Sequence, residues 1–164
     1  MSGASFHRGA SKQDYATPKE FIEAVEKRYG KLVFDLAAHT DNHVTPAWFG
    51  PGGLAEDSLA VNWYDACPAG NLWLNPPFDN IAPWAEKCAL DRRQDQRILF
   101  LVPASVGSNW FANHVYGHAQ VVFVRPRLSF DGKNPYPKDC MLCAYGDLYP
   151  GEPECICWDW RNQL

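Results

Sequence analysis

The sequence predicts an α/β domain whose sheet is mainly parallel with an antiparallel end. Short apolar runs of strand length alternate with amphipathic segments of helix length along most of the 164 residues. Hydrophobic residues make up 46% and charged residues 21%, which is enough to bury one core. No internal repeat or linker divides the chain. We therefore expect a single compact domain over residues 14–164, preceded by a flexible arm at residues 1–13.

The first half of the chain predicts one helix and one strand. The segment Thr17-Pro18-Lys19-Glu20 combines a hydroxyl N-cap, a proline at the first helical position and a glutamate three residues after the cap, which is a capping box. Apolar side chains then recur on one face as far as Gly30, so we expect a helix of about three turns. Residues 32–38 (LVFDLAA) predict a buried strand leading into a tight turn. Residues 39–70 contain many turn formers and predict loops and short pieces.

The second half predicts a strand–helix–strand unit followed by shorter elements. The strand 71–74 (NLWL) must stop at Asn75-Pro76-Pro77-Phe78, because two consecutive prolines cannot continue a β-ladder. An amphipathic segment at 81–93 predicts a helix, and the apolar run 98–102 predicts a strand parallel to the first. The remaining expected elements are a short helix capped by Ser108, a buried strand at 121–124, an exposed excursion at 125–138, a strand at 140–145 and an edge strand at 155–158.

The charge balance limits the class of partner. A net charge of −4 excludes a wholly basic nucleic-acid binder, so a nucleic acid would have to meet a local basic patch. The best candidate for such a patch is the exposed excursion, with Arg125, Arg127, Lys133 and Lys138. No apolar run approaches the roughly 20 residues that a membrane span needs, and the first residues are polar. We expect a cytoplasmic protein with no membrane partner and six reduced cysteines.

Two segments follow directly after apolar strands, where open α/β sheets bind their ligands: residues 35–38 and 75–78. The side-chain oxygen of Asn75 and a carbonyl fixed by a following proline offer two acceptors with little freedom, and Phe78 lies beside them. This arrangement suits a planar group that carries an NH2, such as the edge of an adenine. Accepting both amine hydrogens draws the nitrogen lone pair out of conjugation and makes it a better nucleophile. A target base in a duplex would first have to flip out of the stack.

With these residues in order, the chain resembles the phage-type DNA N6-adenine methyltransferase (Dam) family from about Tyr15 to Tyr145. The tetrapeptide Asn75–Phe78 is similar to the catalytic motif of amino-group methyltransferases. The other matching segments, in chain order, are Thr17-Pro18, Phe34-Asp35-Leu36-Ala37-Ala38, Asn42, Asp57-Ser58-Leu59 with Trp63, Trp84 with Lys87, Val102-Pro103-Ala104 with Trp110, and Arg125 to Phe130. The chain departs from the family pattern where Ala37 and Ala38 replace glycines and Phe78 replaces the commoner tyrosine.

The resemblance implies a Rossmann-like methyltransferase fold and the transfer of a methyl group from S-adenosylmethionine to N6 of adenine in DNA. It implies DNA as the partner, and action in a bacterial host cytoplasm if the chain is phage- or prophage-encoded. A dedicated target-recognition domain does not fit in the remaining length, so we expect sequence specificity that is short, relaxed or supplied by a partner subunit. A homodimer stays open. The implied catalytic residues are Asn75, Pro76, Pro77 and Phe78, and the implied cofactor-binding residues are Thr17, Pro18, Asp35, Ala37 and Asp57.

Two alternatives remain open from the sequence. One keeps the chemistry and changes the acceptor to cytosine N4, RNA or a protein glutamine. The other is a catalytically silent protein that binds nucleic acid or is stabilised by zinc, because Cys140-x-x-Cys143 and Cys155-x-Cys157 could supply four thiolates. Both cysteine pairs lie in apolar runs, so we expect buried, inert thiols and no metal site. The histidines show no metal-ligand spacing.

Overall fold

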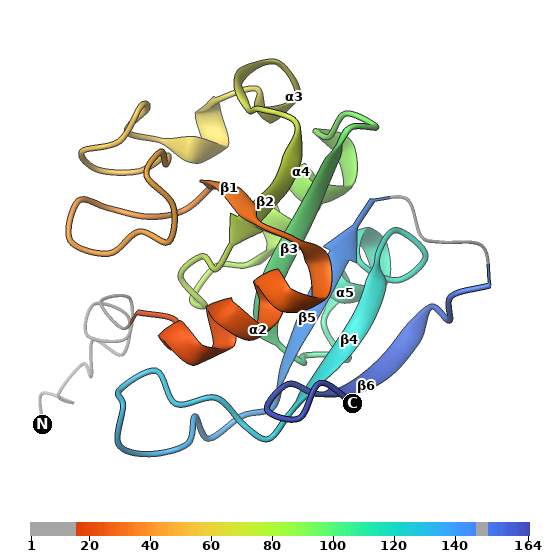
Figure 1. The fold of residues 1–164 in the computed structure, drawn as a ribbon. Coiled ribbons are helices and arrows are strands. Elements are labelled where there is room, and N and C mark those ends of the chain that lie inside the picture. The colour runs from red at the N-terminus through yellow and green to blue at the C-terminus, as the bar shows by residue number, and fades with distance from the viewer. Residues whose placement is uncertain (1–15, 147–150) are drawn as a thin grey trace, which may run out of the picture.

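The computed structural model describes residues 16–146 and 151–164, and the predicted arm at residues 1–13 lies outside them. The described part forms one six-stranded sheet with helices on both faces (Figure 1). The elements in chain order are α2 (Lys19–Tyr29), β1 (Leu32–Asp35), the 3-10 helix η1 (Ser58–Ala60), α3 (Trp63–Ala66), β2 (Gly70–Leu74), α4 (Ala82–Leu90), β3 (Gln96–Pro103), α5 (Asn109–His114), β4 (Gln120–Arg125), β5 (Cys140–Tyr145) and β6 (Cys155–Asp159).

The sheet has the strand order β1-β2-β3-β5-β4-β6. Three pairs are parallel, β1 with β2, β2 with β3 and β4 with β6, whereas β5 runs antiparallel to both β3 and β4. The predicted α/β class and mainly parallel sheet are confirmed. The prediction that the sheet ends in an antiparallel strand is wrong, because the antiparallel strand, β5, lies inside the sheet between β3 and β4. The chain turns back after β4 and inserts β5 between two strands, which buries all six residues of β5 and explains their apolar run.

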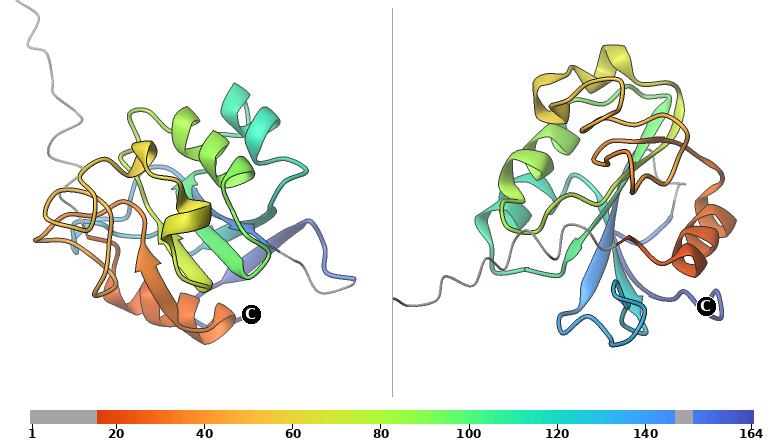
Figure 2. Two further views of the ribbon diagram at one scale, coloured as in Figure 1. Left: turned by 90° about the horizontal axis from the view of Figure 1, so that it is seen from above. Right: turned by 90° about the vertical axis from the view of Figure 1, so that its left-hand side faces the viewer.

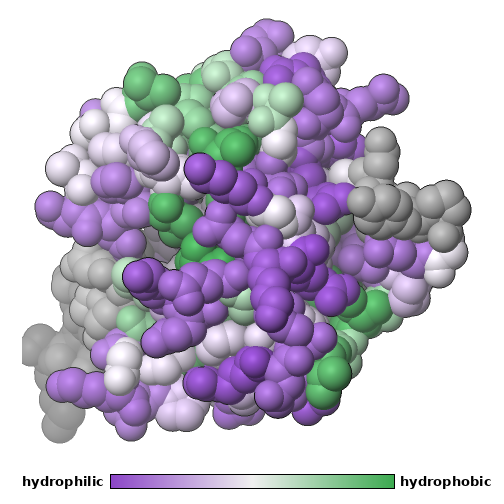
Figure 3. Space-filling view, viewed as in Figure 1, coloured by the Kyte–Doolittle hydropathy of each residue, from purple (hydrophilic) through white to green (hydrophobic). Residues whose placement is uncertain are grey.

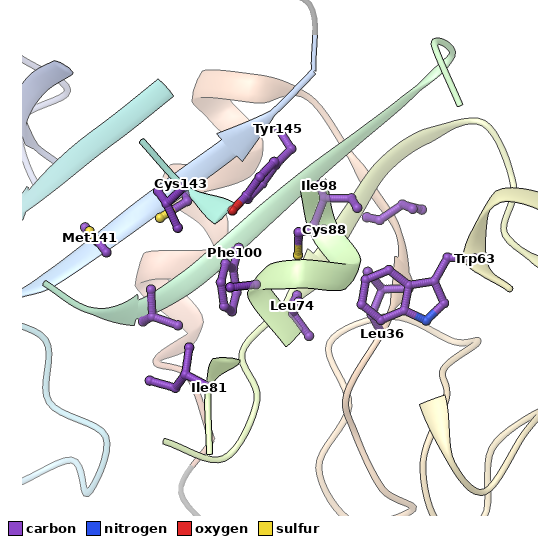
Figure 4. Packing of buried hydrophobic residues seen from close by; sticks show 14 of the residues in the cluster. Leu36, Trp63, Leu74, Ile81, Cys88, Ile98, Phe100, Met141, Cys143 and Tyr145 are labelled. Atoms are coloured by element: carbon purple, nitrogen blue, oxygen red, sulfur yellow. The ribbon is translucent and has the colours of Figure 1, made fainter. Parts of the chain in front are cut away.

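Two apolar layers hold the helices to the sheet. On one face, Phe21 of α2 packs on Trp73 of β2 and on the C-terminal tryptophans Trp158 and Trp160. The other face carries α4 and α5, and Figure 2 shows them on the opposite side of the sheet from α2. In this second layer Cys88 of α4 lies against strand side chains such as Phe100 (Figure 4).

The start of α2 differs from the predicted capping box. Pro18, not Thr17, is the N-cap, and no side chain caps the helix. The Pro18 carbonyl accepts hydrogen bonds from the backbone N–H of Phe21 and Ile22. Thr17 does not cap because its hydroxyl accepts a hydrogen bond from a distant side chain, described below. The predicted Ser108 cap of α5 is confirmed, with the Ser108 hydroxyl accepting from the N–H of Phe111.

The cysteine positions argue against a zinc site. Cys140 and Cys143 are both buried, as predicted, but they belong to the apolar layers on opposite faces of the sheet. Burial raises the pKa of the Cys140 thiol to about 12. Cys155 and Cys157 are exposed, so the prediction of buried thiols is wrong for this pair. Strand β4 separates the two pairs, and residues 16–146 and 151–164 contain no group of three or more side chains that could hold a metal ion.

None of the helices in the described ranges is long and apolar enough to span a membrane. The irregular segment predicted at residues 39–70 is confirmed, since it forms loops with η1 and α3 as its only helical pieces among the described elements. Its first part folds back on the end of β1, where the N–H of Ala38 donates to the carbonyl of Phe49. At Gly50 the two segments come so close that a Cβ would lie 1.7 Å from the Ala38 carbonyl oxygen, and φ is +129°.

Replacing Gly50 with alanine should therefore destabilise the fold by at least about 3 kcal/mol, because both the backbone conformation and the contact with Ala38 must change. Gly117→Ala is the matched control: Gly117 also has a positive φ, of +79°, but a Cβ there would meet no atom within 4 Å. The control should lose only about 1 kcal/mol. Urea unfolding followed by tryptophan fluorescence measures both changes, and equal losses would contradict the close contact.

Candidate active site

The sheet topology brings the sequence-predicted motifs to one edge. Because β1, β2 and β3 are parallel, Asp35 at the end of β1 and Asn75 just after β2 lie at neighbouring carboxyl ends. The segment 126–139, which joins β4 to β5, turns at the same edge, since Pro103 at the end of β3 pairs with Cys140 at the start of β5. Figure 1 shows this edge facing the lower left. Open α/β sheets bind their ligands at this kind of edge.

Asn75 is held at one end of its carboxamide and left unpaired at the other. Its Nδ2 donates a hydrogen bond of 2.9 Å to Oγ1 of Thr17, which lies just before α2. Its Oδ1 is buried and has no hydrogen-bond partner among the described residues. Pro76 and Pro77 follow directly and restrict the backbone of the turn. An unpaired buried acceptor costs about 1–3 kcal/mol, so it marks a position suited to a hydrogen-bond donor from outside the protein.

An aromatic cluster forms around Phe78, three residues after Asn75. The ring of Phe78 has its centroid 6.1 Å from that of Phe130 and 5.9 Å from that of Tyr136, and these two rings are 5.4 Å apart. Phe130 and Tyr136 come from the 126–139 segment, which is anchored by the buried Leu128 and by a hydrogen bond from the Tyr136 N–H to the Leu128 carbonyl. No role for Tyr136 was predicted from the sequence, where its only signal is an aromatic residue within a polar, basic run.

Asp35 organises the turn after β1. Its side chain is 2% exposed, and its two oxygens accept hydrogen bonds from the backbone N–H of Ala37 at 3.2 Å and of Val44 at 2.9 Å. Burial raises the pKa of this carboxyl group to about 7, although both hydrogen bonds lower it. The same turn contains Nε2 of His39, which is buried without a partner among the described residues. Asp35 therefore shapes a turn that has an unpaired polar atom of its own.

The other predicted site residues are more dispersed. Asp57 is exposed and accepts a hydrogen bond from the N–H of Leu59, which caps η1 and connects it to no other predicted site residue in the described part of the chain. Arg127 forms a 2.8 Å ion pair with Asp139. Arg125 lies 3.9 Å from Asp159. The predicted basic residues Lys133 and Lys138 are exposed on the 126–139 segment. The structure thus groups Thr17, Asn75 and Phe78 with this segment and leaves Asp57 as a helix cap.

Two surface hollows lie elsewhere. One of about 260 Å³ is lined by Arg28, Tyr29 and Arg97, near the amino end of β3. The other, of about 310 Å³, lies between α2 and the C-terminal residues, beside Trp160 and Gln163. Neither is lined by a residue that the sequence predicts to be catalytic or to bind the cofactor. The motifs and the unpaired acceptor, rather than hollow size, identify the candidate site.

Comparison with known proteins agrees with the motifs. The family model described as DNA N-6-adenine-methyltransferase (Dam) matches residues 5–140. The chain belongs to this family. It is also similar to a DNA N-6-adenine-methyltransferase of Escherichia phage T1, with 26% identity over 117 residues, which cover 71% of this chain and 47% of that relative. The chain thus spans about half the length of the phage protein that it matches. No solved structure shows a significant match.

The raised pKa of Asp35 predicts a pH dependence of stability. An unfolded aspartate loses its proton near pH 4, whereas the folded carboxyl group keeps it until about pH 7. Between these values the folded state binds more protons, so the free energy of unfolding falls as pH rises, by up to about 1.4 kcal/mol per pH unit. Asp35→Asn removes this titration, so stability relative to the wild type should rise from pH 5 to pH 7. Urea unfolding at several pH values measures this, and a constant difference would contradict it.

Proposed function

We propose that the chain transfers the methyl group of S-adenosylmethionine to the N6 amino group of adenine in DNA. The observation that carries the proposal is the buried Oδ1 of Asn75 at the carboxyl end of β2, which has no partner among the described residues and lies three residues before Phe78 in the sequence. An exocyclic amine would give this oxygen the donor it lacks. Membership of the Dam family and the similarity to a phage DNA adenine methyltransferase support adenine in DNA as the acceptor.

The acceptors act on the nucleophile. Oδ1 of Asn75 would accept one N–H of the adenine amine, and the carbonyl of Asn75 or Pro76, each fixed by a following proline, would accept the other. With both hydrogens engaged, the lone pair of N6 leaves conjugation with the ring and points at the methyl donor. As N6 bonds to the methyl carbon, the carbon–sulfur bond would break, its electron pair would go to the sulfur, and S-adenosylhomocysteine would leave. The methylated amine is then acidic and releases its proton to water, so the site needs no strong base. Phe78 would stack on the flipped base.

The turn after β1 has features that fit the cofactor. Its side chains Ala37 and Ala38 are small, Asp35 holds its backbone, and Nε2 of His39 is a buried polar atom in need of a partner. When bound, S-adenosylmethionine supplies an electrophilic methyl carbon. We assign its binding to Asp35 and Ala37, with Pro18 and the backbone of Thr17 at the start of α2 closing the site. Asp57, which caps η1, would bind a ribose hydroxyl of the cofactor.

The fold and the setting form part of the same proposal. We infer that the mixed sheet is a variant of the Rossmann-like methyltransferase fold, with the cofactor over β1 and the base over β2. The sequence specificity would be short or relaxed, and the protein would act on DNA in the cytoplasm of a bacterial host. A homodimer remains an alternative to a monomer.

The segment 126–139 would hold the DNA backbone. It places Arg127, Lys133 and Lys138 on a surface that Figure 3 shows to be mostly hydrophilic, while Phe130 and Tyr136 of the same segment contact Phe78. Arg125 precedes the segment at the end of β4. Phosphate contacts and base contacts would then come from one anchored loop, which would position the flipped adenine over the acceptors.

Replacing both Lys133 and Lys138 with alanine should weaken DNA binding and reduce its salt dependence. Each lost phosphate contact makes the negative slope of log affinity against log salt concentration shallower by about 0.9. The matched control is Lys27→Ala with Lys31→Ala, which removes the same charge from exposed positions at the other end of α2. Fluorescence anisotropy with labelled duplex DNA at several salt concentrations measures the slopes. Equal slopes for the two double variants would contradict a DNA contact by the 126–139 segment.

The Asn75→Ala variant tests the reaction itself. Wild-type protein incubated with DNA and S-adenosylmethionine should produce N6-methyladenine, and the variant should be at least about 100-fold slower, because a preorganised hydrogen-bonding group has been removed. Asn113→Ala, at an exposed position of α5, is the control and should match the wild type. Nucleoside mass spectrometry measures the product. Formation of N4-methylcytosine, or of methylated RNA or protein only, would contradict adenine as the acceptor.

A further inference from the structure

The hydrogen bond between Thr17 and Asn75 joins two parts of the chain that are 58 residues apart. It is one of the few side-chain to side-chain contacts at the candidate site, and it engages the donor end of the Asn75 carboxamide. The sequence predicted Thr17 as a helix cap and as a cofactor contact. In the structure its oxygen instead faces the residue that carries the unpaired acceptor.

A carboxamide has two ends of opposite character, and only one of them can serve an amine. With Nδ2 on Thr17, the oxygen is available to a substrate N–H. If the group turned over, Nδ2 would face the amine, and two donors would oppose each other. The Thr17 hydroxyl could pair with either end, so in the free protein both orientations leave one end of the carboxamide unpaired. Once an amine is bound, only the orientation with Nδ2 on Thr17 satisfies both ends.

The position of Thr17 is well defined by its neighbours. Pro18 follows it with φ at −55° and accepts the first backbone hydrogen bonds of α2. One turn further on, Phe21 is fully buried and lies against Trp73, with ring centroids 6.4 Å apart. Trp73 belongs to β2, two residues before Asn75. The start of α2 and the end of β2 are thus packed together, which keeps the Thr17 oxygen within hydrogen-bond distance of the carboxamide.

We propose that Thr17 is a positioning residue that orients the Asn75 carboxamide with its oxygen toward the amino group of the substrate. The inference rests on the proposed function for the identity of that group. Thr17 acts through Asn75 and not on the transferred methyl group. Without its hydroxyl, the productive orientation of Asn75 would leave the partly buried Nδ2 with no acceptor, so Oδ1 would point toward the substrate amine for a smaller fraction of the time.

The test compares Thr17→Val, which keeps the shape of the side chain and removes the hydroxyl, with Thr17→Ser, which keeps the hydroxyl. Thr17→Val should lower kcat about tenfold or more, with the Kd for S-adenosylmethionine within about twofold of the wild type. Thr17→Ser should stay within about threefold of the wild-type kcat. The double variant Thr17→Val with Asn75→Ala should be no slower than Asn75→Ala alone, because the hydroxyl then has no carboxamide to orient.

A second readout does not depend on activity. The side-chain NH2 signals of Asn75, assigned by their loss in Asn75→Ala, should exchange slowly with solvent in the wild type and Thr17→Ser, and at least about fivefold faster in Thr17→Val. Weaker cofactor binding with an unchanged kcat in Thr17→Val would overturn the proposal in favour of a cofactor contact. Equal loss of kcat in the Val and Ser variants would overturn it in favour of a packing role. Unchanged exchange in Thr17→Val would also overturn it.

The two proposals fail in different ways. A wild type that binds S-adenosylmethionine but forms no N6-methyladenine contradicts the proposed function, and with it the catalytic consequence of Thr17. The exchange measurement then still decides whether Thr17 orients the carboxamide. A wild type that is active, with an equally active Thr17→Val, leaves the proposed function in place and refutes the positioning role.

Discussion

Parallel pairing of β1 with β2, and of β2 with β3, brings the carboxyl ends of three strands to one edge of the sheet. Everything at the candidate site depends on this arrangement. It places the turn held by Asp35 beside the Asn-Pro-Pro-Phe turn, and the return of the chain into β5 brings the 126–139 segment to the same edge. Packing of Phe21 on Trp73 then adds the start of α2, so four separate segments meet at the edge of the sheet that carries Asn75.

The chemistry of the site follows from which of its polar groups already have hydrogen-bond partners within the protein and which do not. The oxygens of Asp35 are used by backbone N–H groups, and the nitrogen of Asn75 is used by Thr17. The Asn75 side-chain oxygen has no hydrogen-bond partner among the described residues. A fold stabilised by buried apolar layers can tolerate one such acceptor, and an amine that fills it gains an interaction that bulk water does not preorganise. In the proposed function this amine is adenine N6, an assignment that membership of the Dam family supports.

The sequence predicted the elements better than their contacts. The apolar runs of β1, β2, β3 and β5 were sufficient to find the strands, because burial on both faces leaves a local pattern. The place of β5 inside the sheet and the hydrogen bond of Thr17 depend on partners far along the chain, which no local pattern encodes. Cys155 and Cys157 alternate with Ile156 and Trp158, which pack in the layer that contains Phe21, so the two cysteines lie on the other face of this edge strand, where they are exposed.

The most direct measurement is a crystal structure of the protein with duplex DNA and an unreactive analogue of S-adenosylmethionine. We expect an adenine flipped out of the helix, with its N6 about 2.7–3.2 Å from Oδ1 of Asn75. We also expect Nδ2 of Asn75 still to donate to Thr17. An adenine that remains stacked in the duplex, or a bound base whose amino group lies away from Asn75, would contradict the central claim.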